Sequence, residues 1–335
     1  MERPSGGGIG CDRRMPTITV EEIAPSPVPL LRRDEHAHLD RAVRSGELAR
    51  VARGVYAPRE LWANLPPWDR YLSRVHAAAS RYPHAIFVRD SAAALRGLPV
   101  FGEPAWVHAI NSGAAPTRRV GDVIFHSAER MPQHEQRGGI EVATMAEVAI
   151  DAARLRHPAV GLAIVDAALR RTPDLSTGRL RALSETHPSS RGRARARWVM
   201  DRASPTPESP LESVSLAVIE WQGFPPPQCQ VWFRGGGDDD RVDFAWPQWG
   251  IAGEADGEIK YSGELGDARG ALRARGIRDA RLMRRGISTI RHWGWQDLVA
   301  PDLLRTILAS AGLPIIRPAA AGPLRTLAAA LRGAP

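Results

Sequence analysis

The segment RVDFAWPQWGIAGEADGEIKY, residues 241–261, predicts two β-strands joined by a short turn. From Val242 to Trp246, bulky apolar residues alternate with polar or small ones, which is the period of a half-buried strand. Pro247 and Gly250 then mark the turn. This hairpin is the element around which we expect the C-terminal part of the chain to fold.

The second predicted strand carries charged residues two positions apart. Glu254, Asp256, Glu258 and Lys260 would all point to one face of an extended strand. Three carboxylates on one face repel one another unless cations lie among them. Lys260 supplies one positive charge, and a divalent metal ion would supply the rest.

Lys260 is also the only lysine in a chain with 45 lysines and arginines together. Lysine is a compact point charge whose pKa responds to burial, whereas arginine stays charged. A surface ion pair is the simpler interpretation of one lysine beside acidic residues. The size of the acidic cluster favours a functional site.

Composition sets the outer limits on fold and function. A length of 335 residues predicts two or three domains, and a hydrophobic content of 43% is enough for buried cores. No apolar run is long enough to span a membrane, and no apolar secretory segment precedes the first domain. We therefore expect a cytoplasmic protein with no membrane partner. The first 14 residues are rich in glycine and charge, so we expect disorder there, and Met15 is an alternative start.

Cysteine content and net charge narrow the class of partner. Cys11 and Cys229 are far apart and lie in unlike contexts, which argues against a disulfide or zinc framework. The net charge of +8 indicates a polyanionic partner such as nucleic acid. A general bias of the source proteome towards arginine would produce the same charge, and composition alone leaves both explanations open.

The region of residues 25–60 has the layout of a winged helix. Apolar residues at helical spacing around Leu39 predict a helix that Gly46 closes, and residues 48–58, LARVARGVYAP, predict a basic hairpin. In winged helices a helix enters a DNA groove while the hairpin lies on the backbone. We expect Val51 and Val55 to pack inward on the helix. The arginines that would then contact DNA phosphates are Arg41, Arg44, Arg50 and Arg53.

Three stretches of this half resemble AbiEi-type antitoxins of type IV toxin–antitoxin systems. The run SGELARVARGVYAP, residues 45–58, is similar to their N-terminal winged helix, and SAAALRGLPV, residues 91–100, to the segment that follows. A looser resemblance extends through IEVATMAEVAIDAARL and VDAALRR to Arg171. The resemblance implies binding of double-stranded DNA, usually for transcriptional autoregulation, and a toxin as a candidate protein partner. It implies no chemistry.

The middle of the chain reads as mixed α/β, so the expected fold class is α/β in the broad sense, or α+β. His108 and His126 fall in predicted strands without an apparent partner, and we interpret both as structural. The Pro/Ser-rich residues 203–210 predict a linker. The predicted units are a disordered tail (1–24), the winged helix (25–60), a mixed α/β region (61–202), the linker (203–210), a nuclease-like module (211–312) and a C-terminal tail (313–335).

The C-terminal module is predicted to run α–β–β–β–α–β–α. It opens with a helix at residues 210–221, capped by Ser209, and its next strand is residues 228–233. This order resembles the PD-(D/E)XK nuclease fold, and the nearest relatives look like Vsr-like endonucleases. Actinobacterial proteins of this type carry the same AbiEi-like N-terminal half. The residues that match those proteins are Glu212, Gln230, Asp243, Glu254, Asp256 and Lys260.

One departure from those relatives bears on activity. They usually carry a Glu-Lys pair early in the long helix, where this chain has Arg275 and Gly276. The following Arg278, Asp279 and Leu282 are retained. Gly276 weakens a helix by about 1 kcal/mol relative to alanine. The departure leaves open a reduced activity or a copy that binds DNA without cutting it.

The resemblance implies phosphodiester hydrolysis that depends on Mg²⁺ or Mn²⁺. Asp243 and Glu254 would be metal ligands, with Asp256 or Glu258 as a third, because Mg²⁺ prefers oxygen donors. Glu212 would add an outer contact. Lys260 would orient the attacking water and stabilise the developing anion.

Two alignments with the nuclease motif remain open. Glu254-Ala-Asp256 has an acid where the motif has lysine, whereas Glu258-Ile-Lys260 matches the motif literally. Our interpretation favours Glu254 with Lys260 displaced along the same face. Gln230 is a further candidate for contact with DNA.

Three hypotheses for function follow from the sequence. The first is a DNA-binding protein with a metal-dependent endonuclease module. The second is an antitoxin or transcriptional regulator whose C-terminal module is not catalytic. The third is an adaptor that neutralises a toxin encoded nearby. Magnesium-dependent nicking of plasmid DNA separates the first from the others, and co-purification of a toxin separates the third from the second.

Overall fold

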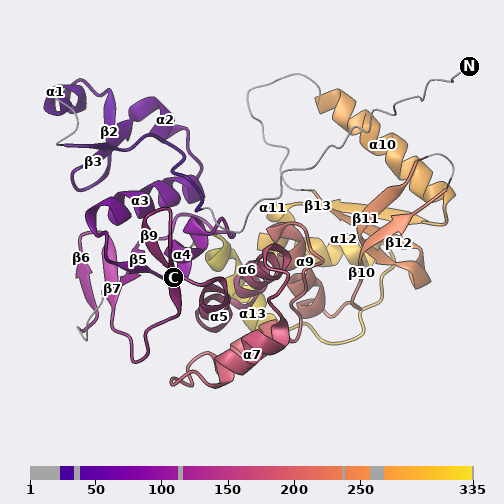
Figure 1. Ribbon diagram of the computed structural model, residues 1–335. Helices are drawn as coiled ribbons and strands as arrows, with labels where there is room; N and C mark the ends of the chain where they lie inside the picture. Colours follow the sequence, from indigo (N-terminus) through magenta and orange to yellow (C-terminus); the bar gives the residue numbers. More distant parts are fainter. Residues whose placement is uncertain (1–22, 34–37, 112–115, 236–237, 257–267, 334–335) are drawn as a thin grey trace, which may run out of the picture.

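Three β-sheets organise the part of the chain that the computed structural model describes, namely residues 23–33, 38–111, 116–235, 238–256 and 268–333. A small sheet lies at the N-terminal end, a six-stranded sheet follows it, and a four-stranded sheet lies at the opposite end of the molecule (Figure 1). Helices fill the space between the second and third sheets. The mixture of helices with several sheets confirms the expected α+β class.

The N-terminal unit contains the predicted helix and hairpin. Its sheet has the strand order β1-β3-β2, and Gly54 has a φ of +79° in the turn between β2 and β3, a conformation that favours glycine. The elements are β1 (Leu31–Arg32), α1 (Leu39–Arg44), β2 (Leu48–Ala52), β3 (Val55–Pro58) and α2 (Arg59–Ala63). The predicted tail of residues 1–24 lies outside the described residues, apart from its last two positions.

The two faces of this hairpin pack against different helices, which corrects the predicted packing. Val51 and Val55 lie in a small core that includes Ala77 of the following long helix. The cluster around Leu39 of α1 is filled instead by Leu48 and other side chains of the sheet. Because side chains alternate along a strand, a two-sided hairpin buries both sets, and the sequence pattern alone does not say which helix covers which face.

The six-stranded sheet has the order β6-β7-β5-β4-β9-β8 and mixes parallel and antiparallel pairs. Its strands are β4 (Ile86–Phe87), β5 (Val107–Ile110), β6 (Arg118–Val120), β7 (Val123–His126), β8 (His134–Arg137) and β9 (Ile140–Ala143). The helices of this region are α3 (Pro67–Arg81), α4 (Arg89–Leu95), α5 (Met145–Leu155), α6 (Pro158–Arg171), α7 (Thr177–Glu185) and α8 (Arg193–Met200).

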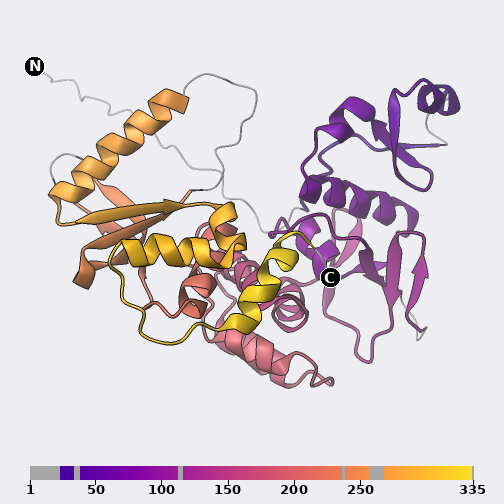
Figure 2. The ribbon, with the colours of Figure 1, turned by 180° about the vertical axis from the view of Figure 1, so that it is seen from behind.

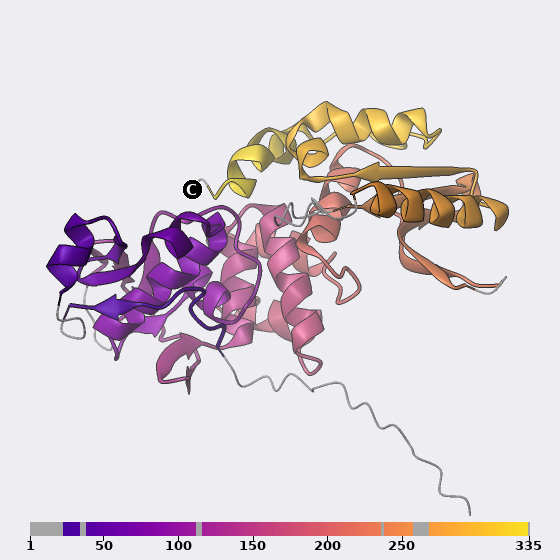
Figure 3. The same ribbon diagram turned by 90° about the horizontal axis from the view of Figure 1, so that it is seen from above.

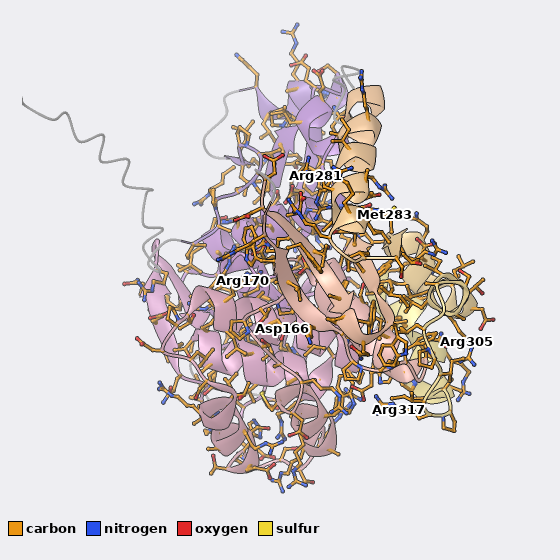
Figure 4. All side chains as sticks on the ribbon, turned by 90° about the vertical axis from the view of Figure 1, so that its right-hand side faces the viewer. Asp166, Arg170, Arg281, Met283, Arg305 and Arg317 are labelled. Atoms are coloured by element: carbon orange, nitrogen blue, oxygen red, sulfur yellow. The ribbon has the colours of Figure 1, made fainter. Side chains whose placement is uncertain are left out.

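The main hydrophobic core continues across the predicted linker. It contains the buried residues of α6 and also those of the first helix of the C-terminal module. The linker is held by α6, because Asp166 accepts a hydrogen bond of 2.8 Å from the backbone N–H of Ser204 and Arg170 donates to the carbonyl of Pro207. Figure 4 shows Asp166 and Arg170 close together in the middle of the molecule. The segment 203–210 therefore connects two halves that share one core.

The C-terminal module forms a four-stranded sheet in the order β10-β11-β12-β13. The first three strands are antiparallel neighbours, and β12 and β13 are parallel. A parallel pair needs a crossover, which the long helix α10 supplies. The elements are α9 (Pro210–Trp221), β10 (Gln228–Phe233), β11 (Asp240–Trp246), η1 (Pro247–Trp249), β12 (Ile251–Ala255), α10 (Ala268–Arg284), β13 (Thr289–Trp293), α11 (Trp295–Val299) and α12 (Pro301–Ser310).

The predicted C-terminal tail contains a packed helix, α13 (Ala321–Leu331), so that prediction was wrong. Leu324 and Leu327 are buried and belong to the main core, as their helical spacing allows. Seen from behind, α13 crosses between the C-terminal module and the middle helices (Figure 2). From above, the N-terminal sheets and the four-stranded sheet lie at opposite ends, with the helices between them (Figure 3).

Among the helices of the described ranges, none is long and apolar enough to cross a membrane.

Candidate active site

The start of α9 buries one of the predicted acidic residues. Ser209 caps the helix, accepting the backbone N–H of Glu212 at 3.2 Å, and Pro210 occupies the first helical turn. The Glu212 side chain folds back to accept the N–H of Glu208 at 2.9 Å. Glu212 is only 5% exposed, so the cap fixes a buried carboxylate beside strand β10.

Gln230 links this carboxylate to the sheet. Its Nε2 donates to Glu212 Oε2 at 2.7 Å and to Asp243 Oδ1 at 3.2 Å. Its Oε1 is buried and has no hydrogen-bond partner in the described structure. Because both neighbours are carboxylate oxygens, the amide must turn its NH₂ towards them. Its oxygen therefore bonds to neither carboxylate. An orphaned buried oxygen is a feature that a ligand would satisfy.

The backbone is strained at the same position. Gln230 has a φ of +55°, in the left-handed region that non-glycine residues rarely adopt. The β10–β11 ladder pairs Cys229 with Phe244 and Val231 with Val242 but omits the pair between them, which is Gln230 and Asp243. Strained residues persist where the surrounding structure over-determines them, and they gather at functional sites.

On either side of this break, the side chains of β11 belong to different hydrophobic clusters. Val242 packs with Leu282 of α10 in a separate cluster, whereas Phe244 belongs to the main core. Regular alternation would put both side chains on one face. Asp243, between them, accepts the backbone N–H of Ala255 at 2.9 Å with its Oδ2. The carboxylate thus takes the place of a backbone hydrogen bond where the pairing between β11 and β12 ends.

Asp243 and Glu254 occupy neighbouring places on adjacent strands. Phe244 pairs with Gly253, so the next positions in this antiparallel register are Asp243 and Glu254. Burial raises the pKa of Asp243, and the charge of Glu212 adds to the rise. Burial also raises the pKa of Glu254 to about 7, with a further contribution from Asp243, although the Arg278 guanidinium lowers it in part. Both carboxylates are therefore in a site where an added cation would stabilise the ionised forms.

Among the described residues, Arg278 is the cation that pairs with Glu254. Its Nη2 donates to Glu254 Oε1 at 2.8 Å and also to the carbonyl of Arg241. The Glu254 side chain is 7% exposed and that of Arg278 is 29% exposed, so the pair lies at the edge of the buried site. The arginine that the resemblance matched as part of an Arg-acid pair thus contacts a predicted metal ligand.

Asp256 is turned away from the other two predicted ligands. Strand β12 ends at Ala255, and Asp256 Oδ2 contacts His292 Nδ1 at 2.8 Å and Arg275 Nη1 at 3.1 Å. Burial raises the pKa of Asp256, but the bond from His292 and the charges of His292 and Arg275 outweigh it, so the net pKa lies below the usual value. Arg275 is thus the ion-pair partner of Asp256.

His292 was not predicted as a site residue. It lies on β13 directly beside Glu254 of β12, and its Nε2 contacts Asp279 Oδ2 at 3.2 Å. The imidazole of His292 therefore lies between the carboxylates of Asp256 and Asp279. No local motif marks His292, because its neighbours are set by the parallel register across a long crossover.

Of the predicted metal ligands that the structure describes, Asp243 and Glu254 lie on adjacent strands, whereas Asp256 has other partners. Among the residues whose placement is described, no three His, Cys, Asp or Glu side chains are grouped to hold a metal ion. The reason is that Asp256 pairs with His292 and Arg275. The chemistry of the remaining donors does fit a hard cation, since Asp243, Glu254 and the orphaned Gln230 Oε1 are all oxygen donors. Glu258 and Lys260 lie outside the described residues.

The predicted DNA-contacting arginines are separated from this cluster. Arg41 and Arg44 on α1, and Arg50 and Arg53 on the hairpin, all have exposed side chains. They lie at the end of the molecule opposite β10, which carries Gln230 (Figure 1). A DNA contact near the carboxylates and a DNA contact at the hairpin would therefore involve distant surfaces of the protein.

Two proteins of Mycobacterium tuberculosis are similar to this chain. They are uncharacterized protein MT2308 of strain CDC 1551 / Oshkosh and uncharacterized protein Rv2248 of strain ATCC 25618 / H37Rv. Each is 34% identical over 221 residues, which cover 64% of this chain and 76% of the relative. No family model and no solved structure matches the chain. Neither relative's name states an activity, so a functional inference rests on the site geometry.

Proposed function

This chain belongs to the same family as the mycobacterial proteins MT2308 and Rv2248, and from its site geometry we propose that it is a DNA-binding protein with a metal-dependent endonuclease module. The reaction is hydrolysis of a phosphodiester bond. The observation that carries the proposal is the arrangement of Asp243 and Glu254 on adjacent strands, two carboxylates of raised pKa, with Asp243 held by the amide of Gln230, whose own Oε1 is buried without a partner among the described residues.

Asp243 and Glu254 would hold the cation. A bound Mg²⁺ or Mn²⁺ lowers the pKa of a coordinated water and neutralises phosphate charge. Asp243 is already oriented by the N–H of Ala255, and Gln230 is held by Glu212. Such supporting bonds fix a ligand's direction before a metal binds. Glu212 therefore acts through Gln230 and does not touch the substrate itself.

Arg278 and His292 supply N–H donors beside Glu254. Arg278 is bonded to Glu254, and its guanidinium has further donors to contact a phosphate oxygen. His292, which contacts Asp256 and Asp279, lies next to Glu254 on strand β13. Both would stabilise negative charge that develops on phosphate oxygens during hydrolysis. Lys260, outside the described residues, keeps its proposed role of orienting water.

The proposal is tested by incubating supercoiled plasmid with the full-length protein and Mg²⁺ or Mn²⁺. Wild type should nick or linearise the plasmid, and Asp243→Asn should not. Asp174→Asn is a matched control, because Asp174 is an exposed aspartate with no side-chain contact in the described structure. Cleavage that persists in a pure Asp243→Asn preparation, at the wild-type rate, would reject the site.

A second candidate function is a DNA-binding regulator whose module is not catalytic. Two ion pairs favour it, since Arg278 already neutralises Glu254 and Arg275 already neutralises Asp256. In that case the arginines replace the metal, and the carboxylates serve stability. The plasmid assay separates the two candidates, because a regulator binds DNA without any nicking over a range of Mg²⁺ and Mn²⁺ concentrations.

The DNA-binding part of the proposal rests on the exposed arginines of the hairpin unit. Replacing Arg50 and Arg53 with alanine should weaken binding to every duplex and flatten the slope of log K against log salt by roughly 2, since each phosphate contact contributes about 0.9. Arg179→Ala with Arg325→Ala is a control of equal charge change on exposed helix positions. The test needs the full chain, because the main core continues across residues 203–210.

A further inference from the structure

A cavity of about 430 Å³ lies in the middle region, away from the carboxylate site. The start of α4, the inner face of α5, strand β5 and the loop before α8 enclose it. A second cavity of about 290 Å³ adjoins it and shares Arg89, Asp151, Arg154 and Arg191 in its lining. Of the candidate active-site residues that the structure describes, none lines either cavity.

Arg89 stands between the two cavities in a strained conformation. Its φ is +54°, and Arg89 and Gln230 are the two non-glycine residues of the described ranges with a positive φ. The half-buried guanidinium makes no hydrogen bond or ion pair within the described structure. Burial lowers the pKa of Arg89, an effect that Asp151 and Asp90 offset only in part. A strained arginine whose guanidinium makes no hydrogen bond or salt bridge with the described residues is expected at a cavity wall where a ligand supplies those contacts.

Positive charge exceeds negative charge in the cavity lining. Five arginines and two aspartates line the larger cavity: Arg89, Arg154, Arg156, Arg191, Arg195, Asp90 and Asp151. Arg156 pairs with Asp90 at 3.4 Å, and burial raises the pKa of Asp90. Burial likewise raises the pKa of Asp151 to about 6, although the charge of Arg89 lowers it in part. The lining thus keeps a surplus of positive charge, and the guanidinium groups of Arg89 and Arg191 make no hydrogen bond or salt bridge among the described residues, although the charges of Asp151 and Asp90 act on Arg89.

The loop that carries Arg191 is fixed in place. Gly192 has a φ of +76°, and a Cβ at this position would lie 2.1 Å from the carbonyl oxygen of Arg154. Only glycine allows this approach of the loop to α5. Arg154 in turn donates to Ser184 and to the carbonyl of Ser189 on the same side. The close approach at Gly192 and the hydrogen bonds of Arg154 thus fix the backbone that carries these arginines. Less conformational entropy is therefore lost when a ligand binds.

Two histidines join the cavities, which corrects the expectation that they lack a partner. His108 Nδ1 and His126 Nε2 lie 2.9 Å apart, and the rings stack. Burial lowers the pKa of His108 to about 3 and that of His126 to about 4, so the pair is neutral. His108 lines the larger cavity and His126 the smaller one. Each ring therefore has one nitrogen left to exchange a hydrogen bond with a ligand.

We propose that the larger cavity binds a small organic phosphate, with its phosphate group between Arg89 and Arg191 and its body against the apolar wall near Trp106. Arginine forks bind phosphate by two parallel hydrogen bonds, and a dianion matches the surplus charge better than a single carboxylate does. The volume lies within the range of small-ligand pockets. Because the phosphate lies inside a cavity, a small molecule fits the site better than the outer surface of a duplex does. This proposal does not rest on the nuclease assignment.

Calorimetry on the full-length protein tests the proposal. The probes are inorganic phosphate, pyrophosphate, the nucleoside monophosphates and the matching nucleosides. We expect at least one phosphorylated probe to bind and its unphosphorylated counterpart to bind at least about tenfold more weakly, because charge-assisted hydrogen bonds are lost. Arg89→Gln with Arg191→Gln should weaken that probe by about tenfold or more. Arg179→Gln, an exposed arginine outside the cavity lining, should leave it unchanged.

Several outcomes would overturn the proposal. One is the failure of every probe to bind wild type at millimolar concentration. Another is equal affinity of nucleosides and their phosphates, and a third is unchanged affinity in the double variant. If only duplex DNA binds and the double variant weakens it, the arginines serve a surface contact and the small-ligand proposal is wrong. Should Arg89→Gln fail to fold by circular dichroism, Arg191→Gln alone carries the test, since Arg191 is exposed at the rim.

Discussion

Two aspartates three positions apart on strand β11 have opposite environments. Asp240 has a side chain only 3% exposed, accepts two bonds from Arg281 at 2.9 and 2.7 Å, and accepts one from Arg285 at 2.9 Å. These bonds, led by that of Arg281, lower its pKa. No cation of the described ranges forms a hydrogen bond or salt bridge with Asp243, and burial raises the pKa of Asp243. Arg281 projects from α10 beside this part of the sheet (Figure 4).

The contrast teaches which carboxylates of this module hold the fold and which are available for chemistry. Asp240 joins β11 to α10 and is fully satisfied, so an added cation gains little there. Asp243 and Glu254 share a break in the sheet with the unpaired Gln230 oxygen, and an added cation gains much. Perturbed pKa values at clustered groups mark functional sites more often than saturated ion pairs do.

The largest effect is expected on cleavage. Glu254→Gln should reduce metal-dependent DNA cleavage by about 10³-fold or more, because it removes a charged metal ligand from the reacting centre. Asp240→Asn, measured on its folded fraction, should stay within about threefold of wild type, since effects away from the reacting groups are small. The measurement is the initial rate of plasmid nicking at saturating Mg²⁺. Equal losses in the two variants would erase the division between the carboxylates.

The next effect is on stability and has the reverse order. Asp240→Asn should lower the free energy of unfolding by about 2 kcal/mol, the figure for a broken buried ion pair reduced for screening near the surface. Because the folded pKa of Asp240 is depressed, its contribution is complete above the unfolded value of 3.8. The difference from wild type should therefore shrink as the pH falls below that value. Urea unfolding at pH 7 and pH 3 measures both quantities, and a difference that grows on acidification contradicts the assignment.

The sequence predicted the strands that carry this contrast but not the break between them. Alternation from Val242 to Trp246 and the turn at Gly250 are local patterns, and both correspond to β11, η1 and β12. The acidic residue of α9 was also predicted from its place after a Ser-Pro cap. Such features depend on a few adjacent residues, which a sequence displays directly.

The partners of the carboxylates depend on distant register, which the sequence does not display. Asp256 was predicted to join Glu254 on one face as a metal ligand, yet His292, 36 positions away, and Arg275 both contact it. The left-handed conformation of Gln230 likewise has no local signal, because glutamine ordinarily avoids it. The continuous core across residues 203–210 escaped for a different reason. A Pro/Ser-rich segment predicts an exposed connection but says nothing about the cores on either side.

A smaller stability effect is expected at Glu254, with a sign opposite to that of Asp240. The folded pKa of Glu254 is raised to about 7, so the folded protein holds that proton more tightly and loses stability as pH rises from about 4.5 to about 7. Glu254→Gln removes this loss and should be more stable than wild type at pH 8 by on the order of 1 kcal/mol. The gain should vanish below pH 4.5.

Magnesium provides the matching measurement for this variant. A cation that binds the folded state raises Tm by mass action, so millimolar Mg²⁺ should stabilise wild type at pH 8 and leave Glu254→Gln unchanged. Thermal melts with and without Mg²⁺, at pH 8 and pH 4.5, give four Tm values for each of the two proteins. An equal Mg²⁺ shift in both proteins would mean that the ion binds elsewhere.

The smallest effect is expected at Cys229, which reports the local potential. Cys229 pairs with Phe244 in the ladder, next to the break, and burial together with Glu212, Asp166 and Asp243 raises the pKa of its thiol to about 12. Only the thiolate reacts, so alkylation by iodoacetamide at pH 8 should be slow. Asp243→Asn removes one of the three charges but leaves the larger desolvation effect, and should therefore accelerate alkylation only about two- to fivefold. The variant Asp240→Asn should not change the alkylation rate, because arginines neutralise the charge of Asp240 in the wild type.

Mass spectrometry of the peptide that contains Cys229 measures the rate separately from that of Cys11. If Asp240→Asn accelerates alkylation as much as Asp243→Asn does, the two carboxylates exert the same field, and the distinction between a satisfied and an available aspartate fails at its most local test.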